Sequence, residues 1–342
     1  MTHVAHNPPH QPGRDRPRPA VQLCPPDPGE ALPAPVRSPA TARAYVLAEK
    51  FAPSLTPVVL VGETGTGKTH LAEHIHRLSP RAAGPLVCRT AAEIVEGLAA
   101  SQLFGHERGA FTGATQRADG MFTEADGGTL LLDDLHRMQL PVQSQLLRVL
   151  GSGVFRPLQA GRDFRARCRL IVAMPECPDR LVKKGVLLSD FRYRLGRCVV
   201  TLPPLCQRKE EIGPLAVAFL RRCPTDTGVP DGPARFGPDV VPALSRASWP
   251  GNLRDLKAAV ERAYLVARGE PEVRLAHLDD ELLRELCAAA FRRNGDADAN
   301  RRVVEEALGA SGGSQAAAAR LLGVNRHTVR RYMPRESPSA ES

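Results

Sequence analysis

Residues 62–69 read GETGTGKT, a complete match to the phosphate-loop pattern G-x-x-x-x-G-K-[ST]. An apolar run over 57–61 precedes the motif and an apolar-periodic helix follows it, which is the strand, loop and helix context that the pattern requires. The glycines let the backbone curl so that successive N–H groups face phosphate oxygens. We therefore expect a nucleotide at Gly62, Glu63, Thr64, Gly65, Thr66, Gly67, Lys68 and Thr69, with a turn that binds no ligand as the alternative.

Two carboxylates follow the apolar run 127–132 and supply the acids that such a loop needs. The run predicts a central parallel strand, whose carboxyl end lies beside the loop, where ligands bind in open α/β sheets. Lys68 is expected to reach the β- and γ-phosphates of ATP, while Thr69 and Asp133 would hold Mg²⁺. Asp134 would then activate the attacking water. For either acid alone, the alternative is a solvated turn.

The helix after the loop contains a second pattern, HLAEH over 70–74, which matches the H-x-x-E-H motif of zinc hydrolases. This segment follows Thr69 directly, on a helix whose start is already assigned to phosphate. A metallohydrolase would also need a third ligand, for which the sequence offers no candidate. We therefore expect its two histidines to be solvated and not to bind zinc.

The chain has 342 residues, enough for more than one domain and a sizeable core. No stretch has the length of a membrane span, and the amino terminus lacks the apolar centre of a secretory signal, which predicts a cytoplasmic protein. The eight cysteines include no C-x-x-C pair and are expected to be reduced and mostly buried. A formal net charge of +9 favours a polyanionic partner.

Residues 1–40 differ in composition from the rest of the chain. They are crowded with proline and have no apolar periodicity, so we expect them to be disordered. The residues from Ser38 to Thr41 are typical of a helix start. Folded structure is expected to begin there, with no sensory domain before it.

Residues 109–114 read GAFTGA, in which flanking glycine and alanine allow a tight turn that lifts Phe111 from the backbone. From physics alone, an exposed Phe111 and a Phe111 tucked into the core are equal alternatives. The wider segment 103–114, LFGHERGAFTGA, resembles the signature of the bacterial enhancer-binding proteins, the sigma-54-dependent transcription activators of the AAA+ superfamily. The resemblance covers residues from about 41 to 333. It implies that ATP turnover drives this loop against sigma-54, with Phe111 and Thr112 in contact.

Several positions depart from the pattern that the resemblance implies. The second acid is usually Glu but is Asp134 here, and the Asn that restrains it matches Thr90. A positional error of about 1 Å can cost about a hundredfold in rate. Either Thr90 compensates for the shorter acid Asp134, or both changes reflect a decayed catalytic site. The sensor strand 169–175 ends in Met174 and Pro175 instead of Thr-Asn, and neither side chain offers a hydrogen bond to a γ-phosphate.

The resemblance also implies two functional arginines. The family usually has two arginines around its F-R-x-D-L-x-x-R-L segment; the first is Leu188 here, and the second is Arg194. Arg194 is thus the candidate to reach a neighbouring subunit's γ-phosphate, a contact worth roughly 10³–10⁵ in turnover. Arg254, within WPGNLRDL over 249–256, matches the second sensor arginine of a small helical lid, with a solvated surface arginine as the alternative. Asn252 is expected to cap the helix that begins there.

Near the carboxyl end, helical patterns over 315–322 and 325–332 flank a turn. Ala319, Gly323 and Val329 occupy the positions where a helix-turn-helix needs a small residue, a turn glycine and a core aliphatic. The segment resembles the Fis-type DNA-binding unit of the same family, with a basic hairpin for protein packing as the alternative. Residues suited to base edges or phosphates are Asn325, Arg326, His327, Thr328, Arg330 and Arg331.

Motifs and resemblance together predict an α/β fold, an AAA+ P-loop NTPase domain with a parallel sheet, followed by a helical lid and an all-α helix-turn-helix. The predicted segments are a Pro-rich tail (1–40), the nucleotide-binding subdomain (41–205), the lid subdomain (206–275), a linker (276–298) and a DNA-binding domain (299–342). The predicted function is ATP-dependent activation, by a homo-oligomeric ring that binds upstream DNA and remodels sigma-54 RNA polymerase. Two alternatives stay open: a DNA regulator with a decayed ATPase, and a AAA+ remodeller of another target.

Overall fold

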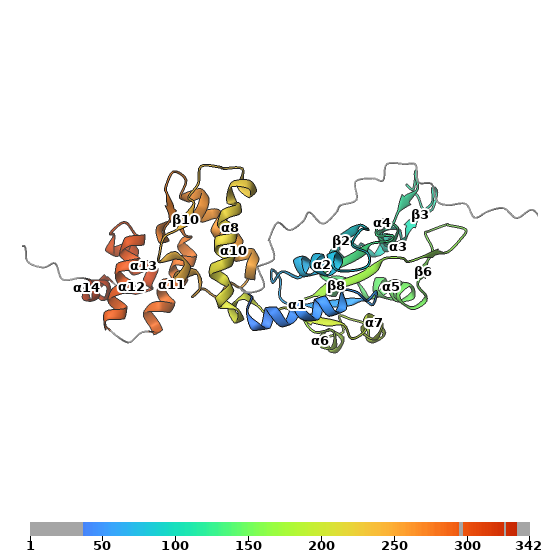
Figure 1. Ribbon diagram of the computed structural model, residues 1–342, viewed down its shortest axis with the longest axis horizontal. Coiled ribbons are helices and arrows are strands. Elements are labelled where there is room, and N and C mark those ends of the chain that lie inside the picture. Colours follow the sequence, from blue (N-terminus) through green and yellow to red (C-terminus); the bar gives the residue numbers. More distant parts are fainter. Residues whose placement is uncertain (1–36, 294–296, 325, 334–342) are drawn as a thin grey trace, which may run out of the picture.

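The computed structural model of the chain describes residues 37–293, 297–324 and 326–333. In Figure 1 an α/β part lies beside a series of helices that continues toward the carboxyl end. The predicted helix start at Ser38 is confirmed, because its side chain accepts a hydrogen bond from the N–H of Thr41 at the start of α1 (Pro39–Phe51). The described fold therefore includes residues 37–40, which were assigned to the tail; the rest of that prediction lies outside the described residues.

A five-stranded parallel sheet forms the centre of the α/β part. Its strands lie in the order β2 (Leu86–Thr90), β5 (Thr129–Asp133), β8 (Arg169–Met174), β1 (Val58–Val61) and β9 (Val199–Thr201). The three middle strands are buried almost throughout, which accounts for their uninterrupted apolar sequences. The predicted parallel sheet is confirmed, and the register aligns the carboxyl ends of its strands at one edge.

Helices cover both faces of this sheet. On one face, α1 and α2 (Lys68–Arg77) pack on strand residues such as Leu60 and Ile171. Alternate residues of the same strands, such as Val59, face a second core on the other side. That core is closed by α3 (Ala99–Phe104), α4 (Met121–Glu124), α5 (Leu140–Ser152), α6 (Pro178–Lys183) and α7 (Ser189–Leu195), with the 3₁₀ helices η2 (Ala91–Glu93) and η4 (Leu135–Arg137), while η3 (Glu96–Leu98) leads into α3.

Two small antiparallel ribbons extend from the α/β part. They are β3 (Gly105–His106) with β4 (Ala118–Asp119), and β6 (Val154–Phe155) with β7 (Phe164–Arg165). The N–H of Leu158 donates to the carbonyl of Gly105 over 3.0 Å, and the N–H of Glu107 donates to the carbonyl of Leu158 over 3.0 Å. The two ribbons are therefore joined by backbone hydrogen bonds.

The chain becomes mainly helical after β9. The elements are η5 (Leu205–Gln207), η6 (Lys209–Glu211), α8 (Ile212–Thr227), β10 (Arg235–Phe236), α9 (Val240–Leu244), α10 (Asn252–Val266), β11 (Glu272–Val273), η7 (Leu275–His277) and α11 (Asp280–Arg293). They enclose a separate core that includes Trp249, Leu256 and Tyr264.

The predicted linker over 276–298 is largely wrong. Most of it is helix α11, whose residues Leu283 and Leu286 are buried in the core of the lid. These leucines recur at helical spacing, so their burial against the lid outweighs the loop-forming tendency of the acidic residues nearby. The turn-rich residues 294–296, which suggested the linker, lie outside the described residues.

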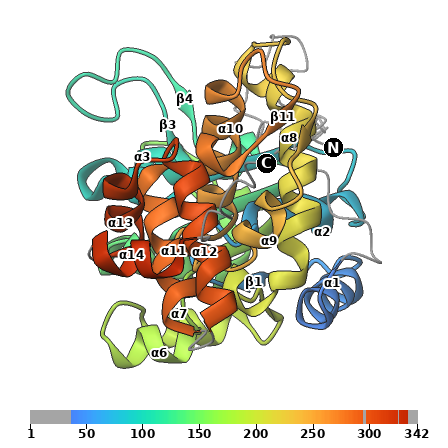
Figure 2. The same cartoon turned by 90° about the vertical axis from the view of Figure 1, so that its left-hand side faces the viewer.

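Three further helices form a small unit next to α11: α12 (Ala297–Ala310), α13 (Gln315–Leu322) and α14 (Arg326–Tyr332) (Figure 2). Ser314 caps α13 by accepting from the N–H of Ala317, and Gly323 ends it in the left-handed conformation, with φ 64°. Ala319 and Val329 are buried in the core of the unit. The predicted helix-turn-helix is therefore confirmed.

Burial of the cysteines differs from the sequence prediction. Of the cysteines whose side chains the structure describes, only Cys223 is buried, whereas Cys177 and Cys206 are exposed and the others are half-buried. Within the described residues, no helix is both long and apolar enough to cross a membrane.

Candidate nucleotide-binding site

The phosphate loop connects β1 to α2, as the sequence predicts. Gly65 and Gly67 have φ angles of 78° and 98°, in the left-handed region that glycine adopts without strain. At Gly65 a Cβ atom would lie 2.1 Å from the carbonyl oxygen of Gly251, so the lid approaches the loop too closely for any side chain there. The Lys68 ammonium donates to the carbonyls of Gly62 and Glu63, over 2.9 Å in each case.

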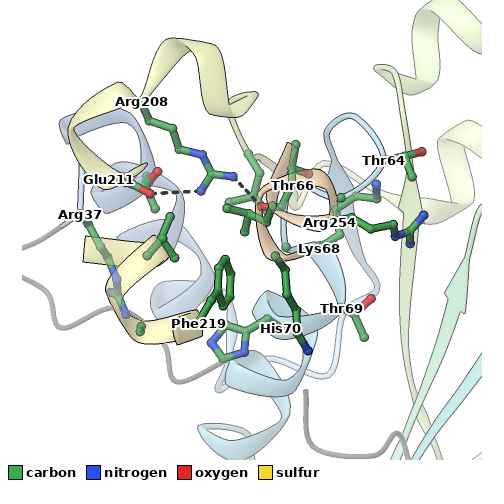
Figure 3. A pocket seen from close by; sticks show the side chains of 18 of the residues that line it. Arg37, Thr64, Thr66, Lys68, Thr69, His70, Arg208, Glu211, Phe219 and Arg254 are labelled. Carbon is green, nitrogen blue, oxygen red and sulfur yellow. Dashed lines mark hydrogen bonds and ion pairs between the residues drawn. The ribbon is translucent and has the colours of Figure 1, made fainter. Parts of the chain in front are cut away.

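A cavity of about 680 Å³ lies over this loop (Figure 3). It is lined by most of the residues predicted to bind nucleotide and metal, namely Thr64, Gly65, Thr66, Gly67, Lys68, Thr69, Asp133, Asp134 and Arg254. The lid contributes another part of the cavity wall, which includes Phe219 and Leu253. Its size and its mixture of cations, hydroxyls and apolar side chains suit a nucleoside triphosphate.

Charges in the cavity influence Lys68. Burial lowers the pKa of its ammonium, while the nearby carboxylates of Asp133 and Asp134 raise it and Arg254 lowers it. A cation at this position is desolvated and therefore interacts strongly with an incoming anion. The arrangement suits a phosphate-binding lysine.

The two acids at the end of β5 adopt different conformations. Asp133 ends the strand, and its carboxylate accepts the N–H of Asp134 over 2.8 Å. Asp134 has a φ of 50°, which is unusual for a residue other than glycine and marks a constrained turn. Its carboxylate lies 4.0 Å from Nδ1 of His136 and 3.8 Å from Nε of Arg137. Beside the Thr69 hydroxyl, these oxygen ligands fit a hydrated Mg²⁺.

Thr90 and Met174 occupy the ends of the strands on either side of β5. Thr90 pairs in register with Asp133, yet in the part of the chain that the structure describes its side chain makes no hydrogen bond to Asp134. Met174 pairs with Val61 and is completely buried in the core of the sheet. The position of the usual polar sensor thus serves packing in this protein.

Arg194 lies apart from the cavity of its own chain. It is exposed on α7, and its guanidinium lies beside Gly151 of α5. Leu188, at the position of the first family arginine, donates its N–H to the side chain of Gln143. Arg194 is therefore not among the residues that line the described cavity of its own chain.

The histidines of the zinc-like pattern are mostly buried, contrary to the prediction of solvated side chains. The side chains of His70 and His74 are 14% and 16% exposed. His74 contacts Glu49 and the ring of Tyr45 on α1, while His70 lines the cavity. Their helix is enclosed by α1 and the lid, which its sequence does not reveal.

Several residues of the site escaped sequence analysis. Arg37, placed in the predicted tail, stacks its guanidinium on Tyr45 at 3.5 Å from the ring centroid and lines the cavity. Asn252 does not cap α10, whose cap is Gly251; instead, its buried side chain contacts the phosphate loop. Arg208 also reaches the loop from the lid. For Arg208, the only signal in the sequence is the three-residue spacing to Glu211, which is common for ion pairs on surface helices.

The GAFTGA loop lies between β3 and β4 and extends away from the domain (Figure 2). Phe111 is 39% exposed and its ring packs edge-on against His106, with centroids 4.9 Å apart. Thr112 is exposed. Hydrogen bonds within the loop, such as that from the N–H of Gly109 to the carbonyl of Ala114, hold the turn.

The predicted DNA-reading residues lie on or beside α14. Arg326, His327, Arg330 and Arg331 are exposed and Thr328 is half-buried, whereas Asn325 lies outside the described residues. This distribution leaves a basic surface on α14, the second helix of the helix-turn-helix.

An α/β domain with a phosphate loop, a helical lid over the nucleotide cavity and a helix-turn-helix defines the class as an AAA+ P-loop NTPase fused to a DNA-binding unit. Family descriptions match each part: the sigma-54 interaction domain over residues 35–201, the AAA+ ATPase lid domain over 206–290, and the bacterial regulatory protein, Fis family, over 297–334. The lid match thus includes most of α11.

Several proteins of similar sequence are named as transcriptional regulators. The regulatory protein FlbD of Caulobacter vibrioides is 31% identical over 86% of this chain and 68% of its own length. NtrC of Azospirillum brasilense is 37% identical over 90% of this chain and 70% of its own length. The crystal structure of NtrX from Brucella abortus in complex with ATP is 28% identical, with a TM-score of 0.64, over 86% of this chain and 67% of that one.

This chain belongs to the family of sigma-54-dependent transcriptional regulators, whose central domain is an AAA+ ATPase. It spans about half the length of several other curated relatives, such as 52% of NtrC from Salmonella typhimurium.

Proposed function

We propose that this protein is an ATP-dependent transcriptional activator that remodels sigma-54 RNA polymerase through its GAFTGA loop. The observation that carries the proposal is that this loop, with Phe111 and Thr112 accessible, extends from the same α/β unit that forms the nucleotide cavity. A change at the cavity can therefore reach the loop through one folded unit. The names of relatives such as NtrC and FlbD support a regulatory role, which would be exercised in the cytoplasm.

The cavity residues have distinct roles in this proposal. Lys68 and the N–H groups of the phosphate loop bind the phosphates, and Thr69 and Asp133 hold Mg²⁺, which neutralises phosphate charge when bound. Asp134 accepts a proton from the attacking water. Arg254 contacts the phosphates from the lid side of the cavity. Binding of ATP is supported by the NtrX structures, which are described as complexes with ATP and with ADP.

Hydrolysis requires a second subunit in this proposal. Arg194 is exposed on α7, outside the residues that line the described cavity of its own chain. A ring of subunits would bring it to the γ-phosphate of the neighbouring chain. The homo-oligomer is therefore part of the mechanism.

DNA binding is assigned to α14. The exposed side chains of Arg326, His327, Arg330 and Arg331, with Thr328 between them, suit a helix that lies in the major groove. Asn325 at its start would complete the set. Binding of an upstream site would raise the local concentration of the activator near the promoter.

The test is activation of a sigma-54-dependent promoter in a purified transcription system. Thr112→Ala should abolish activation while DNA binding and ATP hydrolysis are retained, because the contact with sigma-54 is lost. Thr115→Ala is the matched control, since Thr115 is also exposed but lies beyond the GAFTGA residues. Full activation by Thr112→Ala would show that the loop does not make this contact.

A second candidate function is a DNA-bound switch that binds nucleotide without hydrolysing it. It is favoured by the complete burial of Met174, which removes a polar sensor from the site. Mg²⁺-dependent hydrolysis, measured against protein concentration with Lys68→Ala as the blank, separates the two. Turnover that rises steeply with concentration supports the activator, whereas tight ATP binding without turnover supports the switch.

A further inference from the structure

The lid holds the backbone of the phosphate loop at consecutive carbonyl groups. The side-chain amide of Asn252 donates to the carbonyl of Thr64 over 3.1 Å. The N–H of Leu253 donates to the carbonyl of Gly65 over 2.9 Å. The guanidinium of Arg208 donates to the carbonyl of Thr66 over 2.8 Å (Figure 3). Every one of these donors lies after β9, in the lid part of the chain.

Carbonyl orientation matters here because of peptide geometry. In a planar trans peptide the C=O of one residue and the N–H of the next point in opposite directions. Drawing the carbonyls of Thr64 and Thr66 toward the lid residues therefore turns the N–H groups of Gly65 and Gly67 the other way. An anion-binding loop requires N–H groups in fixed directions. The lid contacts thus act on the groups that would bind phosphate.

Burial and several hydrogen bonds fix the side chain of Asn252 in this contact. Its side chain is completely buried, its oxygen accepts the N–H of Leu205 over 2.6 Å, and its nitrogen donates to the carboxylate of Glu63 over 3.1 Å as well as to Thr64. Asn252 and Trp249 have φ angles of 58° and 51°. Such backbone conformations are unfavourable outside glycine and persist only where surrounding contacts enforce them. The turn before α10 therefore places this amide against the loop.

Arg208 is held in the same way. It is buried and pairs with Glu211 over 3.2 Å. The other carboxylate oxygen of Glu211 accepts the N–H of Ser38 over 2.7 Å, at the start of α1. A buried charged pair fixes its partners strongly, because leaving either charge unpaired is costly. The position of Arg208 is therefore tied to α1 and to the loop together.

We propose that Asn252 and Arg208 are positioning residues through which the docked lid keeps the phosphate loop in its phosphate-binding conformation. This inference rests on the proposed ATP site and adds a regulatory link to it. Displacement of the lid releases the loop carbonyls and lowers the affinity for ATP. By thermodynamic reciprocity, ATP binding stabilises the docked lid by the same factor.

The test measures the Kd of the full-length protein for a fluorescent ATP analogue that is not hydrolysed. Asn252→Ala is expected to raise this Kd by about 10- to 100-fold, because a buried hydrogen-bond donor is lost. Asn300→Ala is the matched control, since Asn300 is also a buried asparagine but lies in α12, outside the nucleotide site. It should leave the Kd unchanged.

A second variant keeps the test decisive if Asn252→Ala does not fold. Asn252→Asp has nearly the same volume but turns an oxygen toward the Glu63 carboxylate and the Thr64 carbonyl, so it should weaken binding more than the alanine variant. Adding Glu63→Gln supplies an amide donor opposite the new carboxylate, and it should recover about tenfold or more of the lost affinity. A general loss of structure would not be rescued by a change at an exposed position.

Reciprocity provides an independent readout. In the natural protein the ATP analogue should slow hydrogen exchange in the first turn of α10, and in Asn252→Ala this protection should be lost. Unchanged Kd in Asn252→Ala and Asn252→Asp, with normal binding by the natural sequence, would overturn the inference. If the natural sequence binds no nucleotide, the proposed function itself fails, and the two outcomes are therefore distinguishable.

Discussion

The proposed nucleotide site consists of a half that would bind ATP (the binding half) and a half that would hydrolyse it (the hydrolytic half), and the two are built differently. In the binding half, Lys68, Asn252 and Arg208 are buried, and each makes several hydrogen bonds to the phosphate loop or to the elements around it. In the hydrolytic half, Asp134 is partly exposed, 4.0 Å from a ring nitrogen of His136 and 3.8 Å from the guanidinium of Arg137, and Arg194 is exposed. Binding therefore rests on mutually supporting contacts, and hydrolysis on a few accessible groups.

All the departures from the family pattern lie in the hydrolytic half or beside it. They are Thr90, Asp134, Met174, Pro175 and Leu188. Buried groups that contact one another resist substitution, because a single change leaves an unpaired polar atom. The side chains at these positions are half-buried or buried, but within the described residues none of them hydrogen-bonds to the phosphate loop. A change there therefore leaves no polar atom of the loop unpaired.

The largest expected effect comes from Arg194→Ala. Turnover should fall by about 10³-fold or more, as for other arginines that reach a neighbouring phosphate, while ATP affinity is retained. A mixture of Arg194→Ala and Lys68→Ala chains should regain activity, because each variant supplies the group that the other lacks. The exposed lid residue Arg235 provides the control, as Arg235→Ala. A mixture as inactive as its components would contradict action between subunits.

The next largest effect is expected at the general base. Asp134→Asn should lower turnover by about 10²-fold or more with little change in ATP affinity, since the amide cannot accept the proton. Asp126→Asn, which alters an exposed ion pair with Arg167, is the control. Steady-state hydrolysis at saturating ATP measures the effect. Equal turnover in Asp134→Asn and the natural protein would remove Asp134 from the mechanism.

A smaller effect, on stability, is expected at Met174. Met174→Thr restores a polar residue at the sensor position but removes a completely buried side chain, so it should lower the free energy of unfolding by about 2–3 kcal/mol. Urea denaturation measures this loss, with Leu55→Thr at an exposed position as the control. A gain in turnover without loss of stability would mean that the buried methionine is not needed for packing.

The smallest expected effect is on the pH dependence of stability, and it concerns the hydrogen bond between His76 of α2 and Thr129 of β5. Burial lowers the pKa of His74, His76 and His136 below the ordinary 6.5. The unfolded chain then binds more protons than the folded one below pH 6.5, so the free energy of unfolding should fall as the pH decreases through that range. His76 on α2 bonds to Thr129 of β5 over 2.9 Å, and thereby joins the phosphate-loop helix to the strand that bears the acids.

His76→Asn should flatten part of this pH dependence. The measurement is the thermal unfolding midpoint from about pH 7.5 to about 5.5, the range in which histidines titrate. His277→Asn, on the lid, is the control. If the unfolding midpoint of both variants falls with decreasing pH as steeply as that of the natural protein, the burial of His76 does not contribute to the loss of stability in acid.

Local sequence was sufficient for the elements whose residues act on their neighbours in the chain. GETGTGKT predicted a loop between strand and helix because its glycines permit a left-handed turn, and Gly65 and Gly67 adopt that conformation. Uninterrupted apolar runs predicted the buried strands. Gly323 predicted the end of α13. In each case the determining interaction spans a few residues.

Contacts between residues that are distant in the chain could not be predicted from local sequence. Asn252 was expected to cap a helix but contacts residues 63 and 64, and Arg37 was placed in a tail although it stacks on Tyr45. The linker prediction missed α11, whose leucines are buried by the lid. The histidines of α2 are covered by α1 and the lid. Such contacts depend on how separate elements pack.

The motif thus specified the chemistry of this protein, a phosphate-binding loop with an acidic strand beside it, because these groups act over short distances in the chain. Packing specified which groups support that chemistry. The lid lies against the loop, and Asn252 and Arg208 reach its carbonyls. Met174 is buried because the helices of the α/β part pack on the sheet. Burial and the meeting of remote residues arise from the complete fold, and no local pattern encodes them.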